Sequence, residues 1–533
     1  MFRRPWYRSH FLILLIIFLL QWLLLFSIRE PTWDAVSYYA YARSVLFDQD
    51  LQFDNDFQLS YETAGEHFAS KRYDQVLTST GRVASPFAIG APILWLPWFA
   101  VLRLVSGFIA FPLPDGSSLS GYERFFVSNI ATWSALLGFL AYLPSYRVAQ
   151  GVTNRSLALI STVTFMFVTP LLYYQFREPM YSHAASALMV ALCIYVWWKQ
   201  YEEIGTAWQG LGLGALIGLA GLVRWQNIAF LLLPLVSVVL LWFKQPAKRR
   251  KETVKPALVY LLVIGAAAMA VFSLQLSVWK ILYGGYITIP QGNAYISWRA
   301  SFLIPLLFSS FRGLLPWMPV FFLAVIGLLA LGRQRPLLGL PLLLVMALAI
   351  YIHGSTRDWF GGGGYGPRRL TSELAILVLG YAVFLRLIPH RFRLWAASLL
   401  SIGLVLHQWF LLRFGLPERL GGRVMSMYPT YNWEDVPLTQ MAADMLNLVP
   451  RIGVQPLAFL VHPGSPLDSL LNQQSVPVQH IASLLSTTVF LLLMLAGGIY
   501  LGRRLRKTSS RVAMIVLIAV CLGLVNLWVL VVS

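Results

Sequence analysis

Apolar runs of about 17 to 23 residues recur along the chain, and no other feature limits its possible folds as strongly. A hydrocarbon core about 30 Å thick needs about 20 apolar residues in a helix, so each run is long enough to cross a bilayer. The spacing predicts about 13 transmembrane helices in an all-α integral membrane protein. The predicted spans lie near 11–28, 124–146, 156–174, 180–198, 207–223, 227–243, 257–279, 314–332, 336–353, 371–388, 394–412, 482–502 and 512–531.

Composition agrees with this assignment. Hydrophobic residues make up 58% of the chain and charged residues 12%, whereas soluble domains carry about 25% charged residues. The net charge is +19, but the basic residues form short runs between apolar stretches, as membrane topology signals do. This pattern excludes a soluble globular protein and argues against a nucleic-acid partner.

The topology depends on the segment 87–107, which is apolar but contains Pro92, Pro97 and Arg103. If this segment does not cross, the basic loops fall on the cytoplasmic side, as the positive-inside rule requires. We therefore predict an interfacial or re-entrant helix there. These loops lie at 147–155, 244–255, 333–335, 391–393 and 503–511.

The same count gives the expected organisation. No small-residue cleavage site follows the first run, so we expect an uncleaved helix with a cytoplasmic N-terminus in the plasma (inner) membrane. The expected outer segments lie at 29–123, 175–179, 280–313, 354–370 and 413–481. We divide the chain into a transmembrane catalytic module at 1–412, an outer loop or small cap at 413–481, and two C-terminal helices at 482–533.

The first outer segment is acidic, with nine of the 22 acidic residues between positions 30 and 74. Asp34 precedes a tyrosine-rich stretch that we predict to be a short helix. Its carboxylate can cap that helix or act as a general base at the membrane surface. The pairs at 48–50 and 54–56 are Asp-x-Asp patterns, which suit Mg²⁺ or Mn²⁺ but are also common in solvated loops.

The first loop, WDAVSYYAYARS at 33–44 and FDQDLQF at 47–53, resembles that of multi-pass GT-C glycosyltransferases. These include protein O-mannosyltransferases and lipid A aminoarabinose transferases. The resemblance covers roughly residues 1–390 and continues in REPMYSH at 177–183, LVRWQ at 222–226, FSSFRGLLPW at 308–317, WFGG at 359–362 and GPRRL at 366–370. It implies a GT-C-like helical bundle with interfacial helices in the first outer loop. It also implies transfer of a sugar from a polyprenyl-phosphate donor to a lipid, glycan or protein acceptor.

The family's acidic residue after the first helix corresponds to Asp34. Protein mannosyltransferases often have an Asp-Glu pair there, and the neighbour here is Ala35, which favours the bacterial relatives. As the base, Asp34 would take a proton from an acceptor hydroxyl, and a single base opposite the leaving phosphate would give inversion.

Arginines at outer helix ends are candidates for binding the donor phosphate, because guanidinium groups stabilise its developing charge. A charge between apolar stretches, such as Arg224, costs at least about 2.5 kcal/mol unless paired and usually marks function. The alternative for each is a side chain that extends to the interface. The candidates are Arg82, Arg224, Arg312, Arg368 and Arg369.

Four further residues are candidates for orienting the acceptor or another part of the substrate. Glu178 and His183 lie near one helix start and, with Asp34, leave a divalent ion open as a cofactor, although a single Glu-His pair is not a metal signature. Tyr38 and Tyr41 could stack on a sugar. His353 follows no pattern and is expected to be structural. The glycine run 361–364 lacks the lysine of a phosphate loop, so we predict a close-approach or hinge loop.

Two other functions stay open. A flippase or transporter of lipid-linked sugars would explain the helices, but transporters place ionisable groups near the bilayer midplane, whereas here they gather at outer helix ends. A glycan ligase or polymerase that uses a lipid-diphosphate donor would share the same chemistry and differ in its donor.

Overall fold

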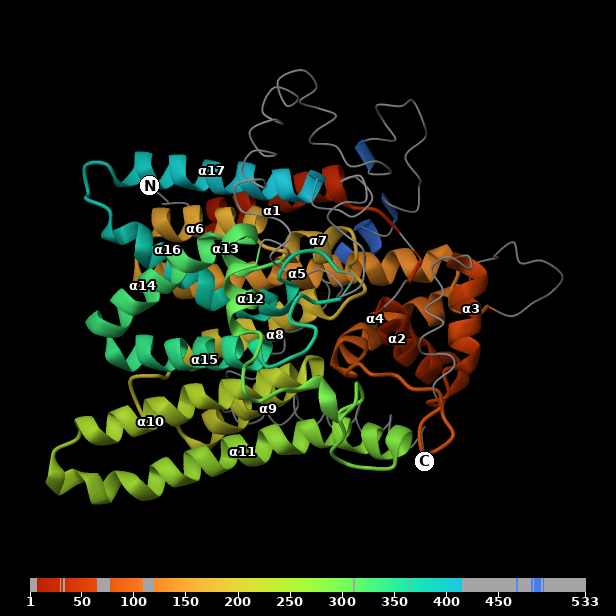
Figure 1. Ribbon diagram of the computed structural model, residues 1–533, viewed down its shortest axis with the longest axis horizontal. Helices are drawn as coiled ribbons and strands as arrows, with labels where there is room; N and C mark the ends of the chain where they lie inside the picture. The colour runs from red at the N-terminus through yellow and green to blue at the C-terminus, as the bar shows by residue number, and fades with distance from the viewer. Residues whose placement is uncertain are drawn as a thin grey trace.

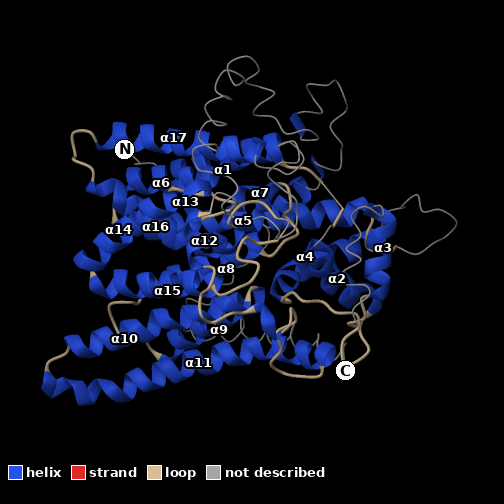
Figure 2. Cartoon of the chain, in the orientation of Figure 1, coloured by secondary structure: helices blue, strands red, loops and turns tan. Residues whose placement is uncertain are grey.

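The computed structural model describes most of the first 414 residues and a few beyond them. The described residues are 7–28, 30–31, 34–64, 77–108, 119–309, 312–362, 364–414, 466–467, 481–482, 484–489 and 492. Within these ranges the regular elements are helices, with two isolated β-bridges, Leu77 with Val83 and Ile296 with Thr356 (Figure 2). The predicted all-α class is confirmed.

Long apolar helices form the body of the molecule (Figure 1). They are α1 (Tyr7–Leu25), α5 (Arg124–Val152), α6 (Arg155–Val168), α8 (His183–Trp198), α9 (Ala207–Val223), α10 (Leu232–Lys244), α11 (Ala247–Tyr283), α14 (Val320–Gln334), α15 (Pro336–Gly354), α16 (Leu374–Leu387) and α17 (Arg393–Phe414). Each predicted span up to 394–412 therefore contains a helix.

Five described helical segments are long and apolar enough to cross a membrane on their own. They are Arg124–Val152, Trp225–Lys244, Ala247–Tyr283, Pro336–Gly354 and Arg368–Leu387. The count of about 13 spans stays a prediction, and so does the division into three regions. The span predicted at 512–531 lies outside the described residues, as do most of 413–481 and most of the span at 482–502.

Shorter helices connect the long ones. They are α2 (Asp34–Arg43), η1 (Ser44–Asp48), α3 (Asp54–Ala64), α4 (Gly90–Ser106), α7 (Leu171–Phe176), η4 (Trp225–Leu231), η5 (Asn293–Tyr295), α12 (Leu303–Phe308), α13 (Leu314–Trp317) and η6 (Arg368–Glu373). Figure 1 shows α2, α3 and α4 gathered at the right-hand end of the bundle.

The opposite end of the bundle carries basic loops. The turns between α10 and α11, between α14 and α15, and between α16 and α17 lie together at the left of Figure 1. They hold Lys244, Arg333 and Arg391 among their basic residues. The bundle therefore has a basic end and an end that carries the first loop, and the side of the membrane that each faces stays a prediction.

The surface of the bundle is apolar. Large side chains are exposed along α10 and α11, including Phe243 at 60%, Leu258 at 54% and Leu262 at 69%. Water would not favour such a surface, whereas lipid tails would cover it. The same helices pack closely inside, because a Cβ at Gly218 of α9 would lie 2.6 Å from the Ala268 carbonyl of α11.

Helix α4 corresponds to the segment 87–107 and contains Pro97 within its span. Its buried face includes Trp95 and Phe99, and it packs against α2, α5 and α9. A Cβ at Gly90 would overlap the backbone of Leu222 and Val223, so glycine allows the start of α4 to touch the end of α9. This contact fixes the first loop against the turn that carries Arg224.

Candidate active site

Asp34 is the first residue of α2 and lies in its first turn, where a carboxylate interacts favourably with the helix dipole. Its Oδ2 accepts a charge-assisted hydrogen bond from Arg368 Nη2 at 2.9 Å. The two residues are 334 positions apart, so the fold brings together the candidate base and one candidate phosphate ligand. A carboxylate has a second oxygen, which leaves Oδ1 as a further acceptor.

The glycine loop holds Arg368 in place. A Cβ on Gly361 would lie 3.0 Å from Arg368 Cγ, and one on Gly364 would lie 2.9 Å from Arg368 Cδ. Gly361 and Gly362 also adopt φ values of +79° and +60°, which side chains disfavour. The close-approach prediction for this loop is confirmed, and what it approaches is the arginine stem.

Aromatic rings complete the support for Arg368. Its guanidinium lies 5.3 Å from the Tyr181 ring centroid and 5.8 Å from that of Tyr174. The Tyr174 hydroxyl accepts a 2.6 Å hydrogen bond from the Tyr365 backbone N–H, which ties it to the same loop. Tyr174 was not identified from the sequence.

Arg224 extends from the turn between α9 and η4, and its Nη1 lies 3.2 Å from His183 Nδ1. A guanidinium only donates, so Nδ1 is the acceptor of this hydrogen bond. Burial lowers the pKa of Arg224 to about 10, and the nearby Arg369 and Arg368 lower it too, so it stays cationic at pH 7. No carboxylate of the described residues lies within ion-pair distance of Arg224.

Two more of the predicted arginines, Arg312 and Arg369, contact backbone and side-chain oxygens. Arg312 donates to the carbonyl of Phe360 at 3.1 Å and to that of Gly362, and burial lowers its pKa to about 10. Arg369 pairs with Asp358, and its Nη2 donates to the Tyr295 hydroxyl at 2.6 Å.

The four arginines influence one another electrostatically and form what we call the arginine group: Arg224, Arg312, Arg368 and Arg369. Two carboxylates, Asp34 and Asp358, pair with two of its members. The positive charge of Arg224 is left without an ion-pair partner in the described ranges. An anion that enters this group would meet an excess of guanidinium charge.

The structure places the remaining predicted residues at different distances from this group. The Tyr38 hydroxyl hydrogen bonds Ser182 Oγ at 2.9 Å, and its ring lies near enough to interact with Asp34 and Arg224. His183 is buried, and its Nδ1 also lies 2.8 Å from Thr371 Oγ1. Glu178 is half-buried and interacts with Tyr181.

Tyr41 and Arg82 form other contacts. The Tyr41 hydroxyl donates to the Ser85 carbonyl at 3.4 Å, and its ring packs on Phe53 with centroids 4.9 Å apart. Arg82 donates to the Leu51 carbonyl at 3.2 Å. Their roles in substrate or phosphate binding stay predictions, and these contacts assign both to the interior of the first loop.

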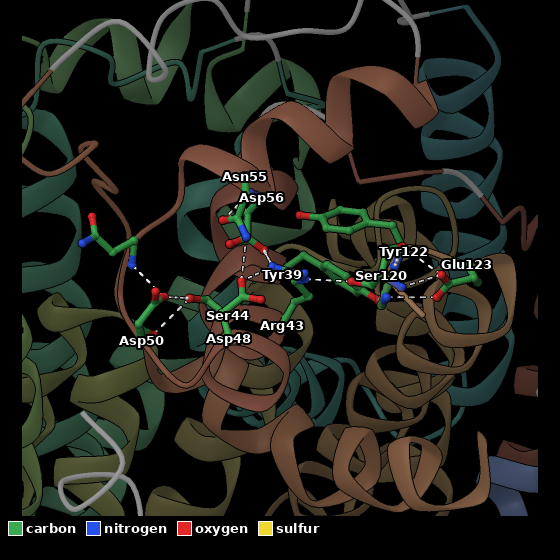
Figure 3. A network of polar contacts seen from close by, with 12 residues as sticks. Tyr39, Arg43, Ser44, Asp48, Asp50, Asn55, Asp56, Ser120, Tyr122 and Glu123 are labelled. Atoms are coloured by element: carbon green, nitrogen blue, oxygen red, sulfur yellow. Dashed lines mark hydrogen bonds and ion pairs between the residues drawn. The ribbon is translucent and has the colours of Figure 1, made fainter. Parts of the chain in front are cut away.

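The acidic first loop is organised around an arginine. Arg43, the last residue of α2, pairs with Asp48 and lies 3.5 Å from Asp56, and its Nε donates to the Ser120 carbonyl at 2.8 Å (Figure 3). Asp56 is fully buried, and burial raises its pKa well above the ordinary value. We call Arg43, Asp48 and Asp56 the first-loop latch.

The latch bears on the predicted metal site. Arg43 places a positive charge between the two Asp-x-Asp pairs, so these residues do not fit a cation site. No group of three or more His, Cys, Asp or Glu within the described ranges is arranged to hold a metal ion. A divalent cofactor stays a prediction, and no step below depends on one.

The fold and the arginine group define a helical multi-pass membrane protein with one candidate base inside an excess of buried positive charge. No protein-family model and no curated protein matches the chain. The chain is similar to solved structures of two GT-C membrane proteins. With TM-scores below 0.5, these likenesses carry none of the reasoning about the site.

ArnT from Cupriavidus metallidurans in the apo state aligns at 14% identity and TM-score 0.45, over 91% of this chain and 76% of that one. The ArnT structure bound to undecaprenyl phosphate aligns at 15% identity and TM-score 0.45, over 91% and 77%. The archaeal oligosaccharyltransferase AglB from Archaeoglobus fulgidus, in complex with an inhibitory peptide and a dolichol-phosphate, aligns at 14% identity and TM-score 0.45. That alignment covers 81% of this chain and 61% of AglB.

Proposed function

We propose that the protein is a membrane glycosyltransferase that moves a sugar from a polyprenyl-phosphate donor to an acceptor hydroxyl at the extracytoplasmic face. The observation that supports this most strongly is the pair of Asp34 and Arg368, 2.9 Å apart within the arginine group. A base beside excess positive charge suits a reaction in which a hydroxyl loses a proton and a phosphate gains charge.

In the proposed reaction the acceptor oxygen bonds to the anomeric carbon of the donor sugar. The bond from that carbon to the phosphate oxygen breaks, and its electron pair stays on the phosphate. Asp34 takes the acceptor proton, and Arg224 stabilises the phosphomonoester that leaves. With one base on the face opposite the phosphate, the anomeric configuration inverts.

Arg368 has a second task in this proposal. Its contact with Asp34 fixes the carboxylate before substrate enters, because the glycine loop and two tyrosines restrict the guanidinium. Its other N–H groups can donate to the donor phosphate while Nη2 stays on Asp34. Base and leaving group would then be set relative to each other by one side chain.

A glycan ligase or polymerase is the second candidate, because its lipid-diphosphate donor would also suit the arginine group. A transporter accounts less well for Asp34, since transport needs no base held by an arginine at one end of the bundle.

The test is turnover of a panel of polyprenyl-monophosphate and polyprenyl-diphosphate sugars by the purified full-length protein, with a crude membrane extract as acceptor. We expect Asp34→Asn to fold and to lose about 10²- to 10⁴-fold in rate, the usual contribution of a general base. Asp54→Asn is the matched control, because Asp54 is an exposed carboxylate of the same loop. Full activity of Asp34→Asn would remove the catalytic assignment. Turnover of lipid-diphosphate sugars alone would favour the ligase or polymerase.

A further inference from the structure

Three buried side chains near the arginine group each keep one hydrogen-bond acceptor unused. Asn227 and His353 are 1% exposed and Glu373 is 2% exposed. Within the part of the chain that the structure describes, Asn227 Oδ1, His353 Nδ1 and Glu373 Oε2 have no hydrogen-bond partner. We call these three residues the acceptor cluster.

The acceptor cluster lies on elements that meet near Arg224. Glu373 and His353 both lie near enough to Arg224 to interact with it electrostatically. The backbone N–H of Asn227 donates to the Arg224 carbonyl at 2.9 Å. The helices that carry the cluster meet here, since α15 packs against both η4 and η6. Three distant parts of the chain thus bring their acceptors to one place.

The orientation of each group follows from its other contacts. Asn227 Nδ2 donates to Ser186 Oγ at 2.8 Å and to the Ala220 carbonyl at 3.0 Å, so the amide oxygen is the atom left over. The His353 ring hydrogen bonds the backbone of Arg369, which leaves Nδ1 as an acceptor. An ionised Glu373 only accepts. With Glu373 ionised, the cluster therefore has no donor that is not already used.

Buried acceptors without donors are rare in native proteins, and each one needs a specific explanation. A ligand that completes this cluster must carry several hydrogen-bond donors, and it must do so beside a residue that we assign to the phosphate. The sugar of a polyprenyl-phosphate donor meets both conditions, because its hydroxyls donate and only one oxygen separates its ring from the phosphorus.

We propose that Asn227, His353 and Glu373 bind the hydroxyl groups of the donor sugar while Arg224 binds the adjacent phosphate. This inference rests on the proposed function and adds the sugar-binding part of the same site. Acceptor hydroxyls would supply the same chemistry. The donor sugar is favoured because the cluster lies near Arg224, whereas the candidate base Asp34 contacts the guanidinium of Arg368.

The test compares the affinity of the full-length protein for sugar-free polyprenyl phosphate with its affinity for polyprenyl-phosphate hexoses and pentoses. The ratio of the two dissociation constants measures what the sugar adds. For the preferred sugar we expect a ratio of about tenfold or more, and Glu373→Gln should reduce this ratio about tenfold. Asp56→Asn is the control, because it removes a buried carboxylate elsewhere.

Analogues of the preferred donor that lack single hydroxyls locate the contact. At least one should bind wild type about tenfold more weakly than its parent, and Glu373→Gln should no longer distinguish the two. His353→Phe provides a second variant if Glu373→Gln does not fold.

The outcomes separate the two proposals. If wild type does not bind sugar-free polyprenyl phosphate, the proposed function fails. If it binds that lipid but the sugar adds nothing, or if the variants leave the ratio unchanged, the acceptor cluster does not bind the sugar. Acceptors that lack single hydroxyls provide the opposite outcome. If wild type turns them over more slowly than the complete acceptor, Glu373→Gln shows no such difference and deoxy donors have no effect, the cluster binds the acceptor and our assignment is overturned.

Discussion

Helix α2 has an arginine–carboxylate contact at each end, and the two contacts differ in their surroundings. At its start, Asp34 pairs with Arg368 among further arginines. At its end, Arg43 is enclosed by Asp48 and Asp56, and its Nε is bound by a backbone carbonyl (Figure 3). The first has an excess of positive charge, and the second has two carboxylates for one guanidinium.

This difference indicates that the arginine group is a binding site and that the latch supports the fold. In the latch, Arg43 has carboxylate and carbonyl partners from within the chain, although Asp56 Oδ2 has no hydrogen-bond partner in the described ranges. The arginine group differs, because Arg224 has no carboxylate partner among the described residues and the acceptor cluster near it has no unused donor. A guanidinium with carboxylate partners fixes the end of α2, whereas a guanidinium without one offers a place for an anion to bind.

The largest effect on stability should come from breaking the latch. Arg43 is 5% exposed, and Arg43→Met would leave the fully buried Asp56 without its cation. Loss of the guanidinium leaves the acceptors of Asp48, Asp56 and Ser120 without their donor, at about 1–3 kcal/mol for each buried group. The variant should melt at a clearly lower temperature in detergent than wild type.

Arg103→Met is the control for the latch. Arg103 lies 4.4 Å from the centroid of Phe47, the ring that Arg43 also contacts, but its side chain is exposed. It should cost less than about 1 kcal/mol. If the two variants melt at the same temperature, the latch contributes nothing beyond packing on Phe47.

Loss of Arg224 in the arginine group should weaken ligand binding rather than reduce the stability of the fold. Arg224→Gln removes the guanidinium that has no ion-pair partner, so the fold should lose little. We expect the affinity for polyprenyl phosphate to fall about 10- to 100-fold, the contribution of a charge-assisted hydrogen bond. A titration of wild type and variant with the sugar-free lipid measures this. A melting temperature that falls as far as that of Arg43→Met would mean that Arg224 supports the fold instead.

Much of the fold follows from local pattern. Apolar length predicted the position of each described long helix, because a helix that faces lipid must be apolar along a whole span. The prediction that 361–364 approaches another group closely also held, since four glycines in a row leave little else to explain them. The sequence could not predict that this loop packs against Arg368. It also could not predict that Arg368 contacts Asp34, because only the tertiary fold brings these two residues together.

Other sequence patterns left alternatives that the sequence alone could not decide between. The aspartates of the first loop suggested a metal site, but a carboxylate binds a guanidinium as readily as a cation, and Arg43 lies within reach. His353 was expected to be structural because no pattern surrounds it. Glu373 was missed, although a carboxylate within a predicted span was a signal that could have been used.

A smaller effect should follow from filling the space around Arg368. A Cβ at Gly364 would overlap the Tyr174 hydroxyl and crowd Arg368 Cδ, so Gly364→Ala should shift the guanidinium away from Asp34. We expect a loss of about tenfold in turnover, since misplaced catalytic groups lose rate steeply. Gly285→Ala is the matched control, because its Cβ would meet atoms no closer than 3.4 Å. Equal activity of the two variants would mean that the loop does not position Arg368.

The smallest predicted effect is a pH dependence of the stability of the fold, and it arises from Asp56 of the latch. Burial raises the pKa of Asp56 above its ordinary value near 4, and Asp48 and Asp50 raise it too, while Arg43 opposes them. The folded state therefore holds the proton to higher pH than the unfolded state, so stability falls as pH rises between the two pKa values. Asp56→Asn, which stays neutral, should abolish this slope.

The melting temperatures of wild type and Asp56→Asn, measured from pH 4 to pH 8, give the sign directly. As pH rises, the stability of the variant relative to that of wild type should increase, by about 1.4 kcal/mol for each unit of pKa shift. Asp54→Asn should show no such trend, because Asp54 is exposed. If the stability of wild type instead increases relative to that of Asp56→Asn as pH rises, Asp56 is ionised, and its attraction to Arg43 exceeds the cost of burying its charge. The latch would then be an ion pair at neutral pH, like the pair of Asp34 and Arg368. The two contacts would differ only in the excess of positive charge around Arg368.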